Sequence, residues 1–216
     1  MSRGLTGGLL FAVRCILRWP NSVHVLTRMK ALLHFAECVD RFNERVGRVV
    51  YWLTFLMVIV GTLNAIARYL DRYTGLGLSS NLYIELQWYM FSVIFLFAAA
   101  YALKHNAHVR VDVLFARLSW RSRVWIDLLG TILFLMPFCI LMIVVSWPSV
   151  ADSWARLEGS PDPGGLPRYP IKTAVPIAFA LLAIQGISML IRQVAALRGL
   201  AEYRPGEAGP EVGEGL

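Results

Sequence analysis

Charged residues and cysteines are both scarce in this sequence. Asp, Glu, Lys and Arg make up only 16% of the 216 residues, whereas soluble globular domains usually carry about 25%. The three cysteines, Cys15, Cys38 and Cys139, lie far apart and form no Cys-x-x-Cys or Cys/His pattern, so neither a disulfide framework nor a zinc site is indicated. Because 57% of the residues are hydrophobic, the composition is typical of a protein that lies in a lipid bilayer.

Four apolar stretches are long enough to cross the hydrocarbon core, which is about 30 Å thick and needs about 20 helical residues. They cover residues 49–67, 82–103, 126–147 and 174–191. None has a charged residue at its centre, where such a residue would cost about 2.5–3.5 kcal/mol, and Pro137 is expected to kink the third. We therefore predict an all-α integral membrane protein with four transmembrane helices. A membrane β-barrel would instead show alternating segments of about ten residues.

The basic residues indicate how the helices are oriented. Before, between and after the four spans there are eight, two, five, three and three of them. Under the positive-inside rule this distribution places both termini in the cytoplasm. The last two segments carry equal numbers of basic residues, and the even number of spans places the C-terminus on the same side of the membrane as the N-terminus. Because the basic residues behind the net charge of +7 cluster beside the spans, we expect no nucleic-acid partner.

The segments outside the spans differ in character. Residues 1–30 form an N-terminal extension without an A-x-A-like cleavage site, so we expect no removable signal peptide. In residues 31–46, apolar side chains recur at helical spacing opposite charged ones, which predicts an amphipathic helix on the cytoplasmic membrane surface before the chain turns into the first span. A helix that packs against a partner is the alternative. Residues 199–216 are rich in Gly, Pro and Glu and are predicted to be a disordered tail.

The sequence offers few groups for chemistry inside the membrane. The four histidines, His24, His34, His105 and His108, all lie outside the spans, which argues against a haem-binding membrane anchor of a redox enzyme. Ion-coupled transport usually needs carboxylates or broken helices near the midplane, so a stand-alone small multidrug-type exporter is also disfavoured. We expect that the chain is not an enzyme.

Glu85 is the one carboxylate within the limits of a span, apart from Asp127 at a span end. It follows Ser79, Ser80 and Asn81, which are residue types that cap helices, and the helix dipole favours an acid in the first turn. Three interpretations remain open. Glu85 is a capped glutamate at the membrane interface, a contact to a partner helix or neighbouring subunit, or a proton-coupling group.

Two segments together resemble a known family. One runs from Glu85 through an alanine-rich helix to Lys104 and continues as His105-Asn-Ala-His108-Val-Arg110-Val-Asp112. The other reads Ser-Pro-Asp-Pro-Gly-Gly-Leu-Pro-Arg-Tyr-Pro-Ile-Lys from Ser160 to Lys172 and leads into the fourth span with Pro176, Gln185 and Gly186. Over roughly residues 35–195 the chain resembles the small membrane subunit of tripartite ATP-independent periplasmic (TRAP) transporters, the DctQ-like family, with the four-helix domain at residues 31–198.

The resemblance implies a small scaffold or auxiliary subunit with four helices, located in the bacterial inner (cytoplasmic) membrane. Its partners would be a DctM-like large membrane subunit that carries the sodium and substrate sites, and a DctP-like periplasmic binding protein that delivers organic acids. Phospholipid would surround the helices. The chain itself would hold no cofactor, because sodium coupling would belong to the large subunit.

Several residues in and near the two segments are candidates for partner contacts or for stabilising the fold: Glu85, Trp88, Lys104, His108, Arg110, Asp112, Arg168, Lys172 and Gln185. The basic residues at the cytoplasmic exit of the second span are expected to anchor at lipid headgroups, and Asp112 is expected to pair with Arg110 or a neighbouring loop residue. The proline-rich connection at residues 148–170 is predicted to be periplasmic. It either contacts the binding protein or the large subunit, or is a solvated loop.

Overall fold

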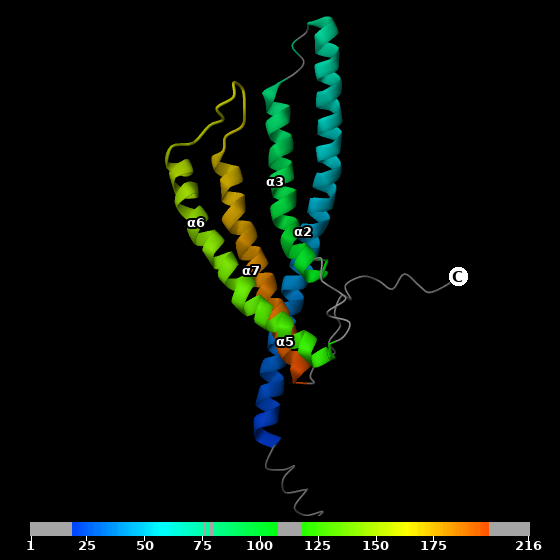
Figure 1. Cartoon of the computed structure of the whole chain (residues 1–216), viewed down its shortest axis with the longest axis vertical. Helices are drawn as coiled ribbons and strands as arrows, with labels where there is room; N and C mark the ends of the chain where they lie inside the picture. The colour runs from blue at the N-terminus through cyan, green and yellow to red at the C-terminus, as the bar shows by residue number, and fades with distance from the viewer. Residues whose placement is uncertain (1–18, 76, 78–79, 108–117, 199–216) are drawn as a thin grey trace, which may run out of the picture.

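The computed structural model describes residues 19–75, 77, 80–107 and 118–198. Within this part of the chain every regular element is a helix, and four helical units are long and apolar enough to cross a membrane. This confirms the prediction of an all-α membrane protein with four spans. The elements are α2 (Trp19–Thr74), α3 (Asn81–Lys104), α5 (Trp120–Gly130), the π-helical segment η1 (Thr131–Leu135), α6 (Met136–Ala155) and α7 (Tyr169–Leu197) (Figure 1).

Helix α7 is the common packing partner in the bundle. It contacts α2, α3 and α6, and α2 and α3 also pair with each other. A buried core around Ala100, Cys139 and Leu182 joins α3, α6 and α7. Figure 1 shows the start of α2 and the end of α7 toward one end of the bundle, which we call the terminal end, and the 156–168 loop between α6 and α7 at the other, the loop end. The two described ends of the chain thus lie on the same side, as an even number of spans requires.

The first span and the amphipathic segment before it form one uninterrupted helix, α2. The turn expected between them is absent, which corrects the prediction of a separate helix ahead of the span. The chain has no proline at this point, and Gly47, its weakest helix former, stays helical with the Tyr101 ring of α3 against its backbone. Ala36 and Val39 of the amphipathic segment are buried. One side of this segment therefore packs against α7 of the same chain, while Leu32, Phe35 and Phe42 stay exposed.

The third span contains the π-helical segment η1, which ends two residues before Pro137. Proline has no N–H to donate and clashes with the carbonyl four residues earlier, and a wider π-turn accommodates it within a membrane helix. This distortion lies where Pro137 was expected to cause one. The helix then continues past Pro148 to Ala155, because a proline in a membrane helix removes one hydrogen bond without ending the helix. The connection predicted at residues 148–170 is therefore shorter and occupies residues 156–168.

Candidate functional site

Polar side chains join the helices at both ends of the bundle. Toward the terminal end lie two groups, which we call the Asp40 cluster (Asp40, Asn43, Gln185, Ser188 and Arg192) and the Glu44 cluster (Glu44, Lys104 and His105). At the loop end, polar side chains of α3, α6 and α7 bind the 156–168 loop. Among the described residues, no three His, Cys, Asp or Glu side chains are grouped so that they could hold a metal ion.

The Asp40 cluster joins α2 to α7. The Asn43 amide donates to Gln185 Oε1 at 2.6 Å, and the Gln185 amide donates to Asp40 Oδ1 at 2.9 Å. The Ser188 hydroxyl donates to the same oxygen at 3.2 Å, and Arg192 forms an ion pair with Asp40 Oδ2. Asn43, Gln185 and Ser188 are buried, whereas Arg192 is half exposed. Three donors thus converge on one carboxylate, and hydrogen bonds to a charged group contribute about 1.5–3 kcal/mol each.

This cluster accounts for the predicted site residue Gln185, a polar side chain in an otherwise apolar span. An unpaired amide is costly in an apolar environment, and α2 supplies both of its partners. The sequence does not single out Asp40 or Asn43, because they lie 145 and 142 residues from Gln185. The only signal was Gln185 itself, since a polar side chain within a span usually pairs with another helix.

The Glu44 cluster joins α2 to the end of α3. Lys104 forms an ion pair with Glu44, and His105 Nε2 lies 3.1 Å from the same carboxylate oxygen. Lys104, predicted to anchor at lipid headgroups, is therefore engaged within the chain. Next along α2, Gly47 lies directly against the Tyr101 ring. Glycine at this point lets the two helices approach closely, as small residues do in membrane helix pairs.

Glu85 binds the loop that joins α6 to α7. The Ser160 hydroxyl donates to Oε1 of Glu85, and the Leu166 backbone N–H donates to Oε2. One turn later in α3, the Tyr89 hydroxyl donates to the Pro167 carbonyl at 2.9 Å. Two side chains of α3 therefore hold this loop against the helix, on both sides of its tip.

The cap predicted for α3 is present and does not involve Glu85. The Ser80 hydroxyl accepts a hydrogen bond from the Leu82 N–H at 3.2 Å. The Glu85 carboxylate serves the loop instead, and a contact to a loop of the same chain was not among the three interpretations drawn from the sequence.

Glu158 fixes the base of the same loop. Lys172 of α7 forms an ion pair with its carboxylate, and the Ser153 hydroxyl of α6 donates to it at 2.6 Å. The hydrogen bond from the Lys172 ammonium, followed by that from Ser153, lowers the pKa of Glu158 because both favour the charged form. The Arg168 backbone N–H donates to the Glu158 carbonyl at 2.8 Å. The predicted residues Lys172 and Arg168 thus both lie at the base of the loop, around a carboxylate that the sequence did not single out.

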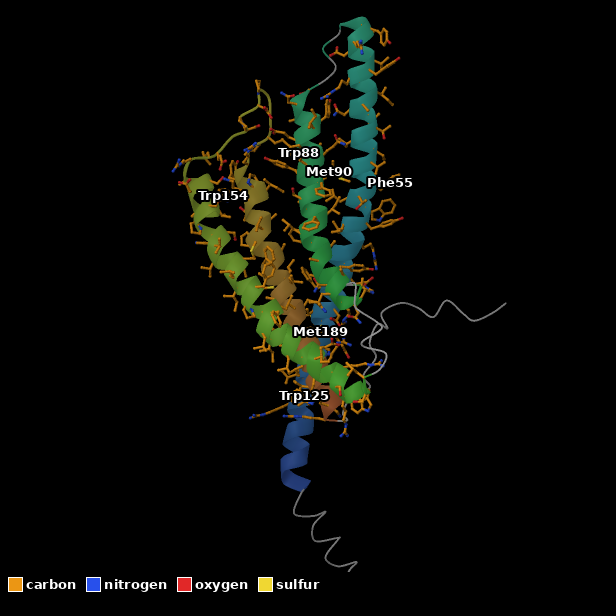
Figure 2. All side chains as sticks on the ribbon, viewed as in Figure 1. Phe55, Trp88, Met90, Trp125, Trp154 and Met189 are labelled. Carbon is orange, nitrogen blue, oxygen red and sulfur yellow. The ribbon has the colours of Figure 1, made fainter. Side chains whose placement is uncertain are left out.

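The remaining predicted residues are spread over the chain. Trp88 lies on the half of α3 toward the loop end (Figure 2) and is 72% exposed. His108, Arg110 and Asp112 lie outside the described residues, as do residues 1–18 and the tail at residues 199–216. Of the predicted residues that the structure describes, Glu85, Lys104, Lys172 and Gln185 each bind a residue of another element, at separate places and not as one site.

Comparison with known proteins places this chain in a family. The family model described as "Tripartite ATP-independent periplasmic transporters, DctQ component" matches residues 57–196. The match runs from the apolar part of α2 to the end of α7 and includes both Glu85 and Gln185. No curated protein and no solved structure matches the chain. Because the match covers more than half of the sequence, the chain belongs to the DctQ family, whose members are small multi-pass membrane components of TRAP transporters and not enzymes.

Proposed function

We propose that this chain is the scaffold subunit of a sodium-coupled importer of organic acids in the bacterial inner membrane. It pairs with a DctM-like large membrane subunit, and a DctP-like binding protein delivers the substrate from the periplasm. The sodium and substrate sites belong to the large subunit, and this chain holds no cofactor. The family match supports this proposal, because tripartite transporters in general combine these components.

The observation that carries the scaffold role is how the chain uses its carboxylates. Asp40, Glu44 and Glu85 each accept hydrogen bonds or ion pairs from donors of the same chain. None of them lies at the centre of a span, because Glu85 is near the start of the second span and the other two precede the first. A coupling group needs a carboxylate that can exchange its partner for an ion near the membrane midplane. Carboxylates committed to holding helices and a loop together suit a subunit that stabilises an assembly.

The exposed apolar surface supports a membrane partner. Along the half of α2 toward the loop end, large side chains such as Trp52, Phe55 and Leu63 are all more than half exposed. Apolar faces of this kind suit phospholipid tails and the helices of another membrane subunit. In this proposal the terminal end, beside which basic residues are most frequent, faces the cytoplasm, and the 156–168 loop faces the periplasm.

Co-purification tests the proposal. The chain carries a tag, is expressed with the products of its neighbouring genes, and is extracted in mild detergent. We expect a large multi-spanning protein in near-equal amount, and sodium-dependent uptake of organic acids in liposomes only when this chain, the large subunit and the binding protein are all present. Recovery of the chain alone, with transport activity of its own, would show instead that it is an exporter.

A further inference from the structure

Helix α6 ends with a leucine in a backbone conformation that favours glycine. Leu157 has a φ of 48°. Its N–H donates to the Trp154 carbonyl at 3.3 Å, and the Glu158 N–H donates to the Ser153 carbonyl at 3.0 Å. These two bonds form the Schellman arrangement, in which the residue at this position is usually Gly and sometimes Asn. A Cβ makes the left-handed conformation unfavourable, so a leucine is held there against its own preference.

Helix α3 ends in the same arrangement with a better-suited residue. Asn106 has a φ of 53°, its N–H donates to the Leu103 carbonyl at 3.1 Å, and the Ala107 N–H donates to the Ala102 carbonyl at 2.9 Å. Asparagine tolerates this conformation because its short side chain can hydrogen-bond locally. The contrast shows that the chain ends one helix with a suitable residue and the other with an unsuitable one.

The Leu157 side chain gains little packing within the chain to offset this cost, because it is 67% exposed. Residues held in sparsely populated backbone conformations cluster at functional sites, where the strain is maintained by the surrounding structure. The exposed apolar side chain therefore points to a contact outside this chain.

The loop that follows Leu157 is held in one shape by three helices. Glu85 and Tyr89 of α3 bind this loop on both sides of its tip, at Ser160, Leu166 and Pro167, while side chains of α6 and α7 bind Glu158 at its base. Its tip, residues 161–164, remains exposed. A loop that is already fixed in shape loses little conformational entropy when it binds a partner, so this arrangement suits recognition better than a flexible connection would.

The composition of the loop surface indicates a water-soluble partner. The exposed tip consists of Pro161, Asp162, Pro163 and Gly164, whereas a membrane-embedded partner would require a continuous apolar face like that of α2. Arg168, also exposed, adds a positive charge at the base of the loop. A polar, preformed loop with one exposed leucine at its start suits the surface of a soluble protein with a small apolar depression.

We infer that the 156–168 loop is a docking surface for the soluble binding protein of the transporter, with Leu157 as its apolar contact and Glu85 as a positioning residue. This inference rests on the proposed function, which places the loop in the periplasm and makes the binding protein a partner.

The test measures binding of the transporter's fluorescently labelled binding protein to the complex of both membrane subunits in nanodiscs. Leu157→Gly relieves the backbone and removes the side chain. The melting temperature of the complex should therefore stay the same or rise, while the dissociation constant rises about tenfold through the loss of one buried leucine contact. Asn106→Gly makes the matched backbone change at the end of α3 and should leave the dissociation constant unchanged.

Two further variants keep the inference open to refutation. Leu157→Asn suits the same backbone and should weaken binding as Leu157→Gly does. Glu85→Gln should also weaken binding and, as a positioning residue would, lower the hydrogen-exchange protection of the Leu166 amide. No binding by the wild-type complex, or wild-type affinity in both Leu157 variants, would overturn the docking surface while the proposed function stands. Failure of the chain to co-purify with a large subunit would instead overturn the proposed function.

Discussion

Close contacts between α2 and α3 at two glycines allow a prediction that separates packing from helix propensity. Gly47 lies against the Tyr101 ring, and about four turns later Gly61 lies against the amide end of Gln87. At both positions an added Cβ would come within 3.0 Å of its neighbour, a separation that real Cβ atoms essentially never show. The neighbours differ in how they can respond. The Tyr101 ring is rigid and is also packed on the His105 ring, with 4.2 Å between the ring centroids, whereas the Gln87 amide can rotate away.

The magnitudes follow from two opposing effects. Replacing glycine by alanine inside a helix gains about 0.5–1 kcal/mol, and overpacking a well-packed contact costs about 1–3 kcal/mol. At Gly47 overpacking should win, so Gly47→Ala should destabilise by about 1–2 kcal/mol. At Gly61 the flexible neighbour yields, so Gly61→Ala should be neutral or stabilise by up to about 1 kcal/mol.

The melting temperature of each variant is measured on the purified chain in mild detergent, with size-exclusion chromatography as the readout of unfolding. With about 2–4 °C per kcal/mol for a chain of this size, Gly47→Ala should melt several degrees below Gly61→Ala. Replacing Tyr101 by leucine in the Gly47→Ala variant should recover part of the loss, because the smaller side chain makes room for the Cβ. If Gly47→Ala melts at or above the wild-type temperature while Gly61→Ala melts below it, the packing argument is refuted.

Three further predictions concern the polar contacts. Because the pKa of Glu158 is lowered in the folded chain, its ion pair with Lys172 contributes stability above the unfolded-state pKa of about 4.3 and loses it as the pH falls through the folded-state value. Hydrogen-exchange protection of the 156–168 loop should therefore fall in acid, and Glu158→Gln should abolish that pH dependence. A double-mutant cycle with Asp40→Asn and Arg192→Gln, measured by thermal unfolding, should give a coupling energy of about 0.5–3 kcal/mol, and strictly additive losses would contradict the ion pair. Ser80→Ala should cost about 1 kcal/mol by removing the cap of α3, and an unchanged melting temperature would show that this cap is dispensable.

The number and place of the spans could be predicted because the signal is local. Each predicted stretch lies within α2, α3, the α5–α6 unit or α7, since about 20 apolar residues in a row have few other uses. The lengths of the helices could not be predicted in the same way. Charged residues such as Arg45 and Arg48 indicated a membrane boundary and a turn, but α2 continues through them, because the neighbouring Glu44 and Gly47 are in contact with α3.

The partners in the candidate site could not be predicted, because they are distant in sequence. Glu85 stood out as a carboxylate in an apolar span and Gln185 as part of the family resemblance, but Ser160 lies 75 residues from Glu85 and Asn43 lies 142 residues from Gln185. No local pattern connects such pairs. Leu157 gave no signal at all, since the residues that indicate a left-handed helix end are glycine and asparagine.

The first half of α2 belongs to the functional unit, although the family match begins only at residue 57. Asp40, Asn43 and Glu44 precede the match, and without them Gln185 would lose both partners and Lys104 its carboxylate. Each buried polar group left unpaired costs about 1–3 kcal/mol. This is a large part of the net free energy of unfolding of a typical domain, which is only about 5–15 kcal/mol. The other half of α2 contributes little to the core and exposes its apolar side chains. The two halves of one helix thus have different roles: the half toward the terminal end fixes the bundle, and this leaves the other half available to a membrane partner.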